Sequence, residues 1–215
     1  MNRKNALLDT DIVMKIGGFT EEKLLSKILS SFQSNLFIHE YLIQEELLTG
    51  KLALDQLKEM ITNSEVTILK ECELNTNEMF EYKSALSILA SEMQVDLTKK
   101  RCKNAGEVKS MAMAFAKDFE YFISDDKAAR VAAKKHLQKL DGTYLTTIRM
   151  QDIVKHVKLN QETLGINRKT ARSLYLYGVN PKLARNETEI RKLEIIREHL
   201  KNDFDQNLWP LEQQS

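Results

Sequence analysis

Short apolar stretches alternate with longer amphipathic segments along the first two thirds of the chain. Five stretches rich in apolar or β-branched residues are typical of strands: residues 6–8, 36–38, 66–69, 119–123 and 144–148. Between them, residues 24–32, 79–93 and 108–115 carry apolar side chains at the i, i+3, i+4 spacing of a helix. This alternation predicts an α/β fold, with a parallel sheet of about five strands flanked by helices.

The pattern changes near residues 147–152. Beyond that point it predicts helices only, at residues 151–157, 168–177 and about 183–202. The last of these has an apolar stripe suited to docking on the core or on another subunit, which would make a homo-oligomer. The stripe consists of Ile190, Leu193, Ile196 and Leu200. We therefore predict a principal domain over residues 1–150 and an all-helical C-terminal extension over residues 151–215.

Composition excludes several classes of protein. The 215 residues are 42% hydrophobic and 29% charged, and no apolar run approaches the roughly 18 residues that a membrane span requires. The N-terminal residues do not have the pattern of a signal peptide, so we expect a cytoplasmic protein without a membrane partner. Cys72 and Cys102 lack metal-site spacing and are expected to be free, buried thiols. The four histidines lie in no recognisable nucleophile motif.

The net charge of +1 hides a basic stretch. Residues 149–185 contain eight basic and two acidic residues, whereas residues 187–212 contain four basic and seven acidic ones. Within the basic stretch, Arg168, Lys169 and Arg172 are candidates for binding a nucleic-acid backbone, although a solvated helix face is the common alternative. Tyr175 and Tyr177 follow them and are candidates either for stacking on bases or for packing.

Carboxylates follow two of the predicted strands where the apolar run stops. Asp9 follows residues 6–8, and an acid at the carboxyl end of a parallel strand faces the crevice in which such sheets bind ligands. Capping of the following turn is the alternative for Asp9. After residues 36–38 three glutamates compete, Glu40, Glu45 and Glu46. We choose Glu46 because it directly precedes Leu47 and Leu48, while a surface glutamate that complements a helix dipole is the alternative.

Two further acidic positions lie at predicted helix starts. Gly106 frees the backbone where a helix begins, and Glu107 lies in its first turn. Asp125 and Asp126 follow the strand at residues 119–123, and a divalent cation would offset the repulsion between them. For both positions, helix capping is the structural alternative.

Three of these segments together resemble the PIN-domain nuclease family. They are Leu-Leu-Asp-Thr-Asp at residues 7–11, Gly-Glu-Val at 106–108 and Phe-Ile-Ser-Asp-Asp-Lys-Ala-Ala-Arg at 122–130. The resemblance covers about two thirds of the chain. It implies a parallel sheet flanked by helices and an acidic pocket that binds Mg²⁺ or Mn²⁺ and hydrolyses RNA. Many members of the family are toxins held by an antitoxin, so a protein inhibitor is a further implied partner.

The resemblance also implies roles for individual residues. The four catalytic acids would be Asp9, Glu46, Glu107 and Asp126. The metal ligands would be Asp9, Glu107, Asp125 and Asp126. Ser124 would be the hydroxyl residue that accompanies the last acid, and Lys127 or Arg130 would neutralise charge on the phosphate or pair with nearby acids. The chain departs from the family in having Glu107 where aspartate is frequent, and in its extra C-terminal residues. The competing hypothesis is a non-catalytic PIN-like module that binds nucleic acid or protein.

Overall fold

The computed structural model describes residues 3–21, 23–46, 50–99, 102–138 and 142–179. Internal contacts divide the chain into two units, which we call the sheet unit (Met1–Arg149) and the helical unit (Met150–Ser215). The division falls within the range 147–152 expected from the sequence. The helix expected at residues 183–202, with its apolar stripe, lies outside the described residues.

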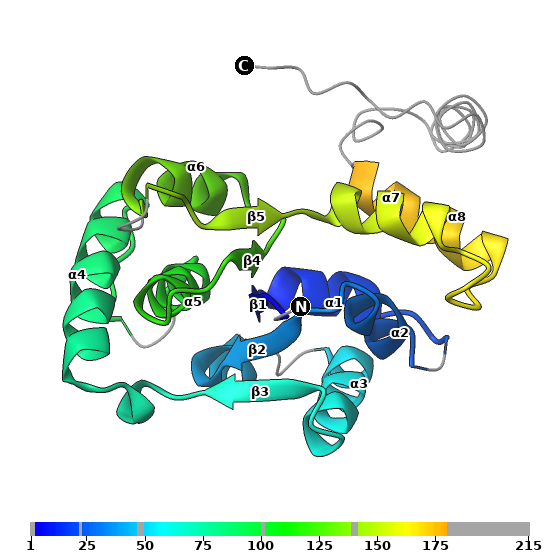
Figure 1. Ribbon diagram of the computed structural model, residues 1–215, viewed down its shortest axis with the longest axis horizontal. Helices are drawn as coiled ribbons and strands as arrows, with labels where there is room; N and C mark the ends of the chain where they lie inside the picture. Colours follow the sequence, from blue (N-terminus) through cyan, green and yellow to red (C-terminus); the bar gives the residue numbers. More distant parts are fainter. Residues whose placement is uncertain (1–2, 22, 47–49, 100–101, 139–141, 180–215) are drawn as a thin grey trace. The chain divides into compact units, whose positions relative to one another are not determined.

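The sheet unit is built on five parallel strands in the order β3-β2-β1-β4-β5 (Figure 1). The strands are β1 (Asn5–Leu8), β2 (Asn35–His39), β3 (Val66–Leu69), β4 (Tyr121–Ile123) and β5 (Thr146–Ile148). The predicted α/β class and the five-stranded parallel sheet are therefore confirmed. Two of the strands are shorter than expected. Phe119 is buried but lies before β4, and Tyr144 forms an isolated antiparallel bridge with Gln138 instead of extending β5.

Helices cover both faces of this sheet. They are α1 (Thr10–Gly17), α2 (Leu24–Ser30), α3 (Lys51–Thr62), α4 (Thr76–Glu92), α5 (Ala105–Ala116) and α6 (Lys127–His136). Leu7 and Phe122 pack with α4, α5 and α6 in one core cluster. Side chains alternate along a strand, so Leu8 and Ile123, also fully buried, point to the other face, where α1, α2 and α3 lie (Figure 1).

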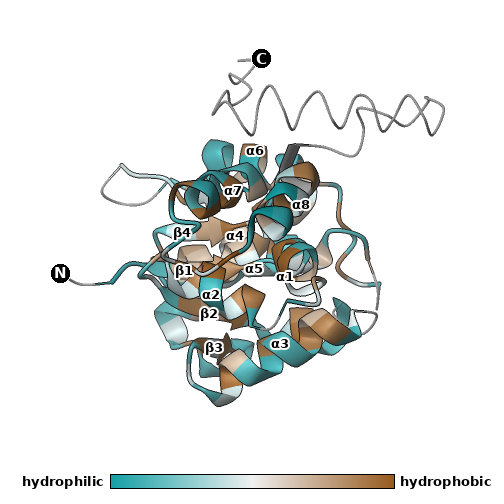
Figure 2. Cartoon of the chain, turned by 90° about the vertical axis from the view of Figure 1, so that its right-hand side faces the viewer, coloured by the Kyte–Doolittle hydropathy of each residue, from teal (hydrophilic) through white to brown (hydrophobic). Residues whose placement is uncertain are grey.

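Two of these helices, α1 and α3, were not among the elements expected from the sequence. They pack closely on each other, since a Cβ atom built on Gly17 would lie 2.8 Å from the Cα atom of Ala53. Helix α3 buries Ala53, Leu57 and Met60, and Figure 2 shows its ribbon alternating between hydrophobic and hydrophilic segments. Tertiary packing of this kind stabilises short amphipathic helices whose sequence signal is weak on its own.

The described part of the helical unit contains α7 (Met150–Leu159) and α8 (Arg168–Val179), which pack on each other. The side chain of Asn167 accepts a hydrogen bond from the backbone N–H of Thr170 at 2.9 Å, as a helix N-cap does. Ile153, Val157 and Leu174 are among the buried apolar side chains. No helix in the described ranges is long and apolar enough to cross a membrane.

Both cysteines are free, as expected, but the prediction that they are buried is wrong. Cys72 is exposed and Cys102 is half-buried. Cys72 lies in the short 3₁₀ helix Glu71–Glu73 that follows β3, none of whose residues is buried.

Candidate functional site

The strand order reverses at the central strand, β1. The chain runs from β1 outward through β2 to β3 and then crosses back to place β4 on the other side of β1. In open α/β sheets, ligands bind where the strand order reverses in this way. Asp9 and Ser124 directly follow β1 and β4, and the backbone N–H of Asp9 donates to the carbonyl of Ile123 at 3.0 Å. The two side chains therefore lie together where the strand order reverses.

Asp9 is fully buried and hydrogen-bonded to its neighbour across the sheet. The Ser124 hydroxyl donates to Asp9 Oδ2 at 2.6 Å, and the Ser124 oxygen accepts from the backbone N–H of Asp126 at 3.2 Å. Burial raises the pKa of Asp9 from 3.8 to about 6, with further contributions from the charges of Asp11 and Glu46, while the bond from Ser124 opposes the rise. Asp9 is thus a carboxylate whose charge is costly in the folded protein.

Glu46 reaches the same place from the end of β2. It is the last residue of a π-helical turn, Leu42–Glu46, an irregular form of helix that occurs frequently at functional sites. The Thr10 hydroxyl donates to Glu46 Oε2 at 2.7 Å and lies 3.4 Å from Asp9 Oδ1. Among the three glutamates considered from the sequence, Glu46 makes these contacts, whereas Glu40 accepts a hydrogen bond from the backbone N–H of Glu71.

Gly106 permits the close approach of Glu46 to the start of α5. The backbone N–H of Gly106 donates to Glu46 Oε1 at 3.1 Å. A Cβ atom on residue 106 would lie 2.2 Å from Glu46 Oε1 and 2.5 Å from Leu42 Cδ2, closer than any side chain tolerates. From the sequence, Gly106 was expected to give the backbone conformational freedom. The structure indicates a different role for this glycine: the absence of a side chain leaves room for Glu46.

Glu107 adds a third carboxylate from the first turn of α5. Burial raises its pKa from 4.5 to about 7, and the charges of Asp9, Glu46 and Asp126 raise it further, against a hydrogen bond from its own backbone N–H. Glu107 is therefore near enough to the other three predicted acids for their charges to raise its pKa. Uncompensated carboxylates so arranged repel each other, and a divalent cation is the usual means of offsetting that repulsion.

The two aspartates after β4 have separate partners. Asp126 is the N-cap of α6, and its Oδ1 accepts from the backbone N–H of Ala129 at 2.7 Å. Asp125 forms an ion pair with Lys15 at 2.7 Å, and Lys15 also pairs with Asp11 at 2.6 Å. The capping alternative therefore holds for Asp126, although this bond uses one of its two oxygens. Asp125 was expected to join the metal ligands, and here it is engaged with a lysine.

The donor set has the right chemistry for a hard cation, but it is not a preformed cage. In the described part of the chain, no group of three His, Cys, Asp or Glu side chains is placed so that it could hold a metal ion jointly. The carboxylates of Asp9 and Glu46 are bridged by the hydroxyl of Thr10. Oxygen ligands of this type suit Mg²⁺ or Mn²⁺, and such a site would require movement of the Glu46 and Glu107 side chains.

Sequence reasoning gave no role to Thr10 or Lys15. Thr10 links two acids, and Lys15 pairs with two others. A hydroxyl residue immediately after a strand-terminal aspartate is a signal that could have drawn attention to Thr10. No local pattern links Lys15 to Asp125, which is 110 positions away in the chain.

The basic candidates divide between the two units. In the sheet unit, Lys127 is exposed and Arg130 is half-buried on α6. In the helical unit, Arg168, Lys169 and Arg172 line one shallow depression on α8. Tyr175 is fully buried, so the packing alternative is correct for this residue and the stacking alternative is wrong, while the side chain of Tyr177 lies outside the described residues.

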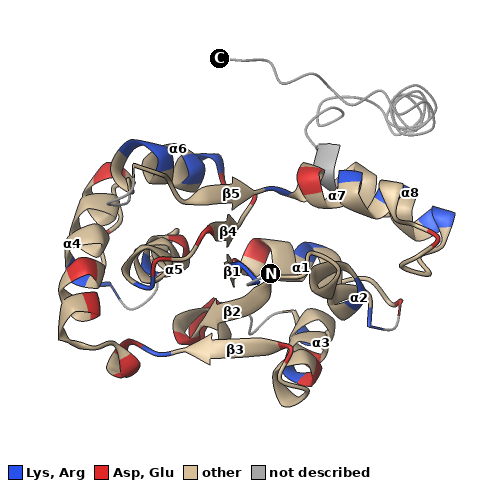
Figure 3. Cartoon of the chain, in the orientation of Figure 1, with Lys and Arg blue, Asp and Glu red and all other residues tan. Residues whose placement is uncertain are grey.

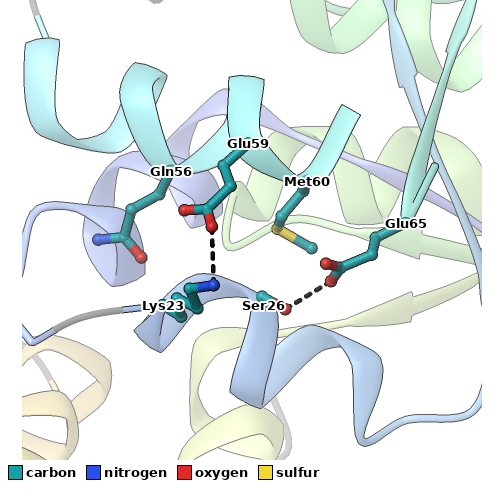
Figure 4. Close-up of a pocket in the computed structure, with 6 residues that line it drawn as sticks. All are labelled: Lys23, Ser26, Gln56, Glu59, Met60 and Glu65. Atoms are coloured by element: carbon teal, nitrogen blue, oxygen red, sulfur yellow. Dashed lines mark hydrogen bonds and ion pairs between the residues drawn. The ribbon is translucent and has the colours of Figure 1, made fainter. Parts of the chain in front are cut away.

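A second polar cluster, between α2 and α3, is not a candidate ligand site. Figure 4 shows Lys23 paired with Glu59 and Ser26 bonded to Glu65. The pocket that these residues line encloses about 10 Å³, which is at most enough for one water molecule. Its charged side chains pair with each other or with Ser26, and Gln56 bonds to backbone groups of Gly17, Phe19 and Leu25.

Comparison with known proteins supplies no family for the chain. No protein-family model, no curated protein and no solved structure matches it. The resemblance to PIN-domain nucleases rests on the sequence motifs alone and stays a prediction.

Proposed function

We propose that the sheet unit is a metal-dependent ribonuclease that hydrolyses RNA phosphodiester bonds with Mg²⁺ or Mn²⁺. One observation carries the proposal: carboxylates from separate segments, one of them fully buried and two with raised pKa values, lie near one another where the strand order reverses. The segments are the ends of β1 and β2 and the start of α5, and they contribute Asp9, Glu46 and Glu107.

The residues that would hold the cation are Asp9, Glu46 and Glu107, with Asp126 at the edge of the group. A bound cation of this kind lowers the pKa of a coordinated water and neutralises charge on a phosphate. The chain's own contribution is positioning. Ser124 fixes one oxygen of Asp9, while Thr10 and the backbone N–H of Gly106 each fix one oxygen of Glu46. These hydrogen bonds orient the two carboxylates, while a closed metal site would still require movement of the Glu46 and Glu107 side chains.

The alternative is a non-catalytic module of the same fold that binds nucleic acid or protein. The engagement of Asp125 with Lys15 and of Asp126 with the α6 N-terminus favours it, because both reduce the number of carboxylate oxygens that face a ligand. An inhibitor or antitoxin that covers the site is compatible with either function and is a separate prediction.

Two measurements on the purified full chain test the proposal. Cleavage of a labelled single-stranded RNA should require added Mn²⁺ or Mg²⁺ and should be lost in Asp9→Asn and in Asp126→Asn. Millimolar Mn²⁺ should also raise the thermal midpoint of the wild type, because a ligand that binds only the folded state stabilises it. Wild-type activity in Asp9→Asn would contradict the assignment of this residue. Stabilisation by Mn²⁺ without cleavage of any RNA would favour the binding module.

A further inference from the structure

Helix α6 carries basic side chains and no acidic ones. Its sequence, Lys-Ala-Ala-Arg-Val-Ala-Ala-Lys-Lys-His, has four Lys or Arg residues. Figure 3 shows this helix marked for Lys and Arg alone along its length, next to the acidic residues that precede it. The helix begins directly after Asp126, so its first turn adjoins the candidate site.

Three of the four basic residues form a single row. Ala129, Ala132 and Ala133 are buried and define the face of α6 that packs on the core. Lys127, Arg130 and Lys134 are spaced by three and four residues, which places them together on a different face of the helix. We call these three residues the basic row. Its ends are seven residues apart, or about 10 Å along a helix axis.

The basic row is not explained by ion pairing. Among the described residues, the side chains of Lys127, Arg130 and Lys134 make no hydrogen bond or salt bridge. Lys135, the fourth basic residue, differs in this respect: it pairs with both carboxylate oxygens of Glu92, at 2.9 and 3.1 Å. Positive charge on the row is therefore available to a partner.

Helix stability does not explain the row either. Cations near a helix C-terminus complement the helix dipole, and this accounts for Lys134. Lys127 and Arg130 lie in the first four residues, where the dipole disfavours positive charge. Two cations are thus kept at the end of the helix where they are least favourable for folding and closest to the acids.

We propose that the basic row binds the phosphodiester backbone of single-stranded RNA and guides it to the carboxylates beside Asp126. The proposal rests on the proposed nuclease function and identifies how that site would recruit its substrate. The acids alone would repel RNA, so an adjacent positive surface is needed to bring phosphates near them. A line of three charges over about 10 Å can follow a short run of phosphates on one strand. The basic row itself contains no aromatic side chain, and His136 at the end of α6 pairs with Glu92, so the contact would be with phosphates and independent of base sequence.

The experiment measures binding apart from cleavage. A fluorescein-labelled 20-nucleotide oligouridine is titrated with the full chain in EDTA, and its fluorescence anisotropy is followed at several salt concentrations. Replacing all three residues of the basic row with alanine should weaken binding about thirtyfold, or about threefold for each charge if the effects add. The dependence of log K on log salt should become shallower by about 2, since each single-strand phosphate contact contributes about 0.7.

Lys135→Ala is the matched control. It removes a neighbouring charge from the same helix, but one that already has a partner, so binding should stay within about twofold of the wild type. Alanine favours helix formation, and circular dichroism checks that the triple variant is folded. Lys134→Ala, with one exposed residue changed, provides a second measurement and should weaken binding about threefold.

Three results would overturn the proposal: a folded triple variant that binds like the wild type, an equal loss in Lys135→Ala, or tighter binding of a duplex through the same residues. Cleavage is scored separately in Mn²⁺. If RNA binding depends on the basic row but the protein cleaves no RNA, the RNA-binding role of the row is supported and the proposed nuclease function is refuted. If the protein cleaves RNA but binding is unchanged in the triple variant, the nuclease function is supported and the RNA-binding role of the basic row is refuted.

Discussion

Replacing Asp9 with asparagine should stabilise the metal-free protein at pH 8 while abolishing its activity. Asp9 is fully buried, and its pKa is raised from 3.8 to about 6, chiefly by burial. A raised carboxylate pKa means that the folded state holds the proton more tightly than the unfolded state. Wild-type stability therefore falls as the pH rises from about 4 to about 6 and levels off above about pH 7. Asparagine has a similar shape and no charge, so it removes this loss.

The size of the effect follows from the pKa. At about 1.36 kcal/mol per pH unit, a rise from 3.8 to about 6 costs at most about 3 kcal/mol at pH 8 and less than about 1 kcal/mol near pH 4. Relaxation around the charge reduces the upper figure, so we expect a gain of about 1–3 kcal/mol. A chain of this size gains about 2–4 °C per kcal/mol, which gives a rise of about 2–12 °C in thermal midpoint.

The assay is thermal denaturation in EDTA at pH 4 and pH 8, followed by circular dichroism. Asp55→Asn is the control, because Asp55 is exposed on α3 and its charge is not among the causes of the raised pKa of Asp9. If Asp9→Asn is less stable than the wild type at pH 8, or shifts the midpoint equally at both pH values, the electrostatic account of this site is wrong.

Two further predictions concern the site. Gly106→Ala should displace Glu46, because the new Cβ would lie 2.2 Å from its Oε1. The affinity for Mn²⁺ and the rate of RNA cleavage should each fall by about tenfold or more. Unchanged Mn²⁺ affinity, measured by calorimetry, would show that Glu46 is not a ligand. Mn²⁺ affinity should also rise between pH 6 and pH 8, since the cation must displace protons from Asp9 and Glu107, whose pKa values are about 6 and about 7. A flat profile, or one unaltered in Glu107→Gln, would contradict this.

The sequence was informative about the sheet because burial imposes a local pattern. The central strand β1 is fully buried from Ala6 to Leu8, and such a strand must be continuously apolar, so its position and end could be read directly. Strand ends at the margin were less clear. Phe119 and Tyr144 resemble strand residues in composition, and only the pairing of β4 with β5 excluded them. The short helix α1 was missed because it depends on packing against α3.

The acids at the candidate site illustrate the same division. Sequence position alone placed Asp9 at a strand end and Glu107 at a helix start, because an apolar run that stops at an acid is a local signal. The choice of Glu46 over Glu40 could be tested only in three dimensions, where Thr10 and Gly106 contact Glu46. These contacts join residues that are 36 and 60 positions apart.

By itself the sequence determined the α/β class, the positions of the buried strands and the presence of acids where strands or helices begin and end. These features follow from hydrophobic periodicity, which is set by neighbours along the chain. The tertiary structure decided which acids share an environment, and which are taken up by a lysine or a helix cap. It did so because pKa values, ion pairs and close backbone approaches depend on distances between segments that the chain order does not specify.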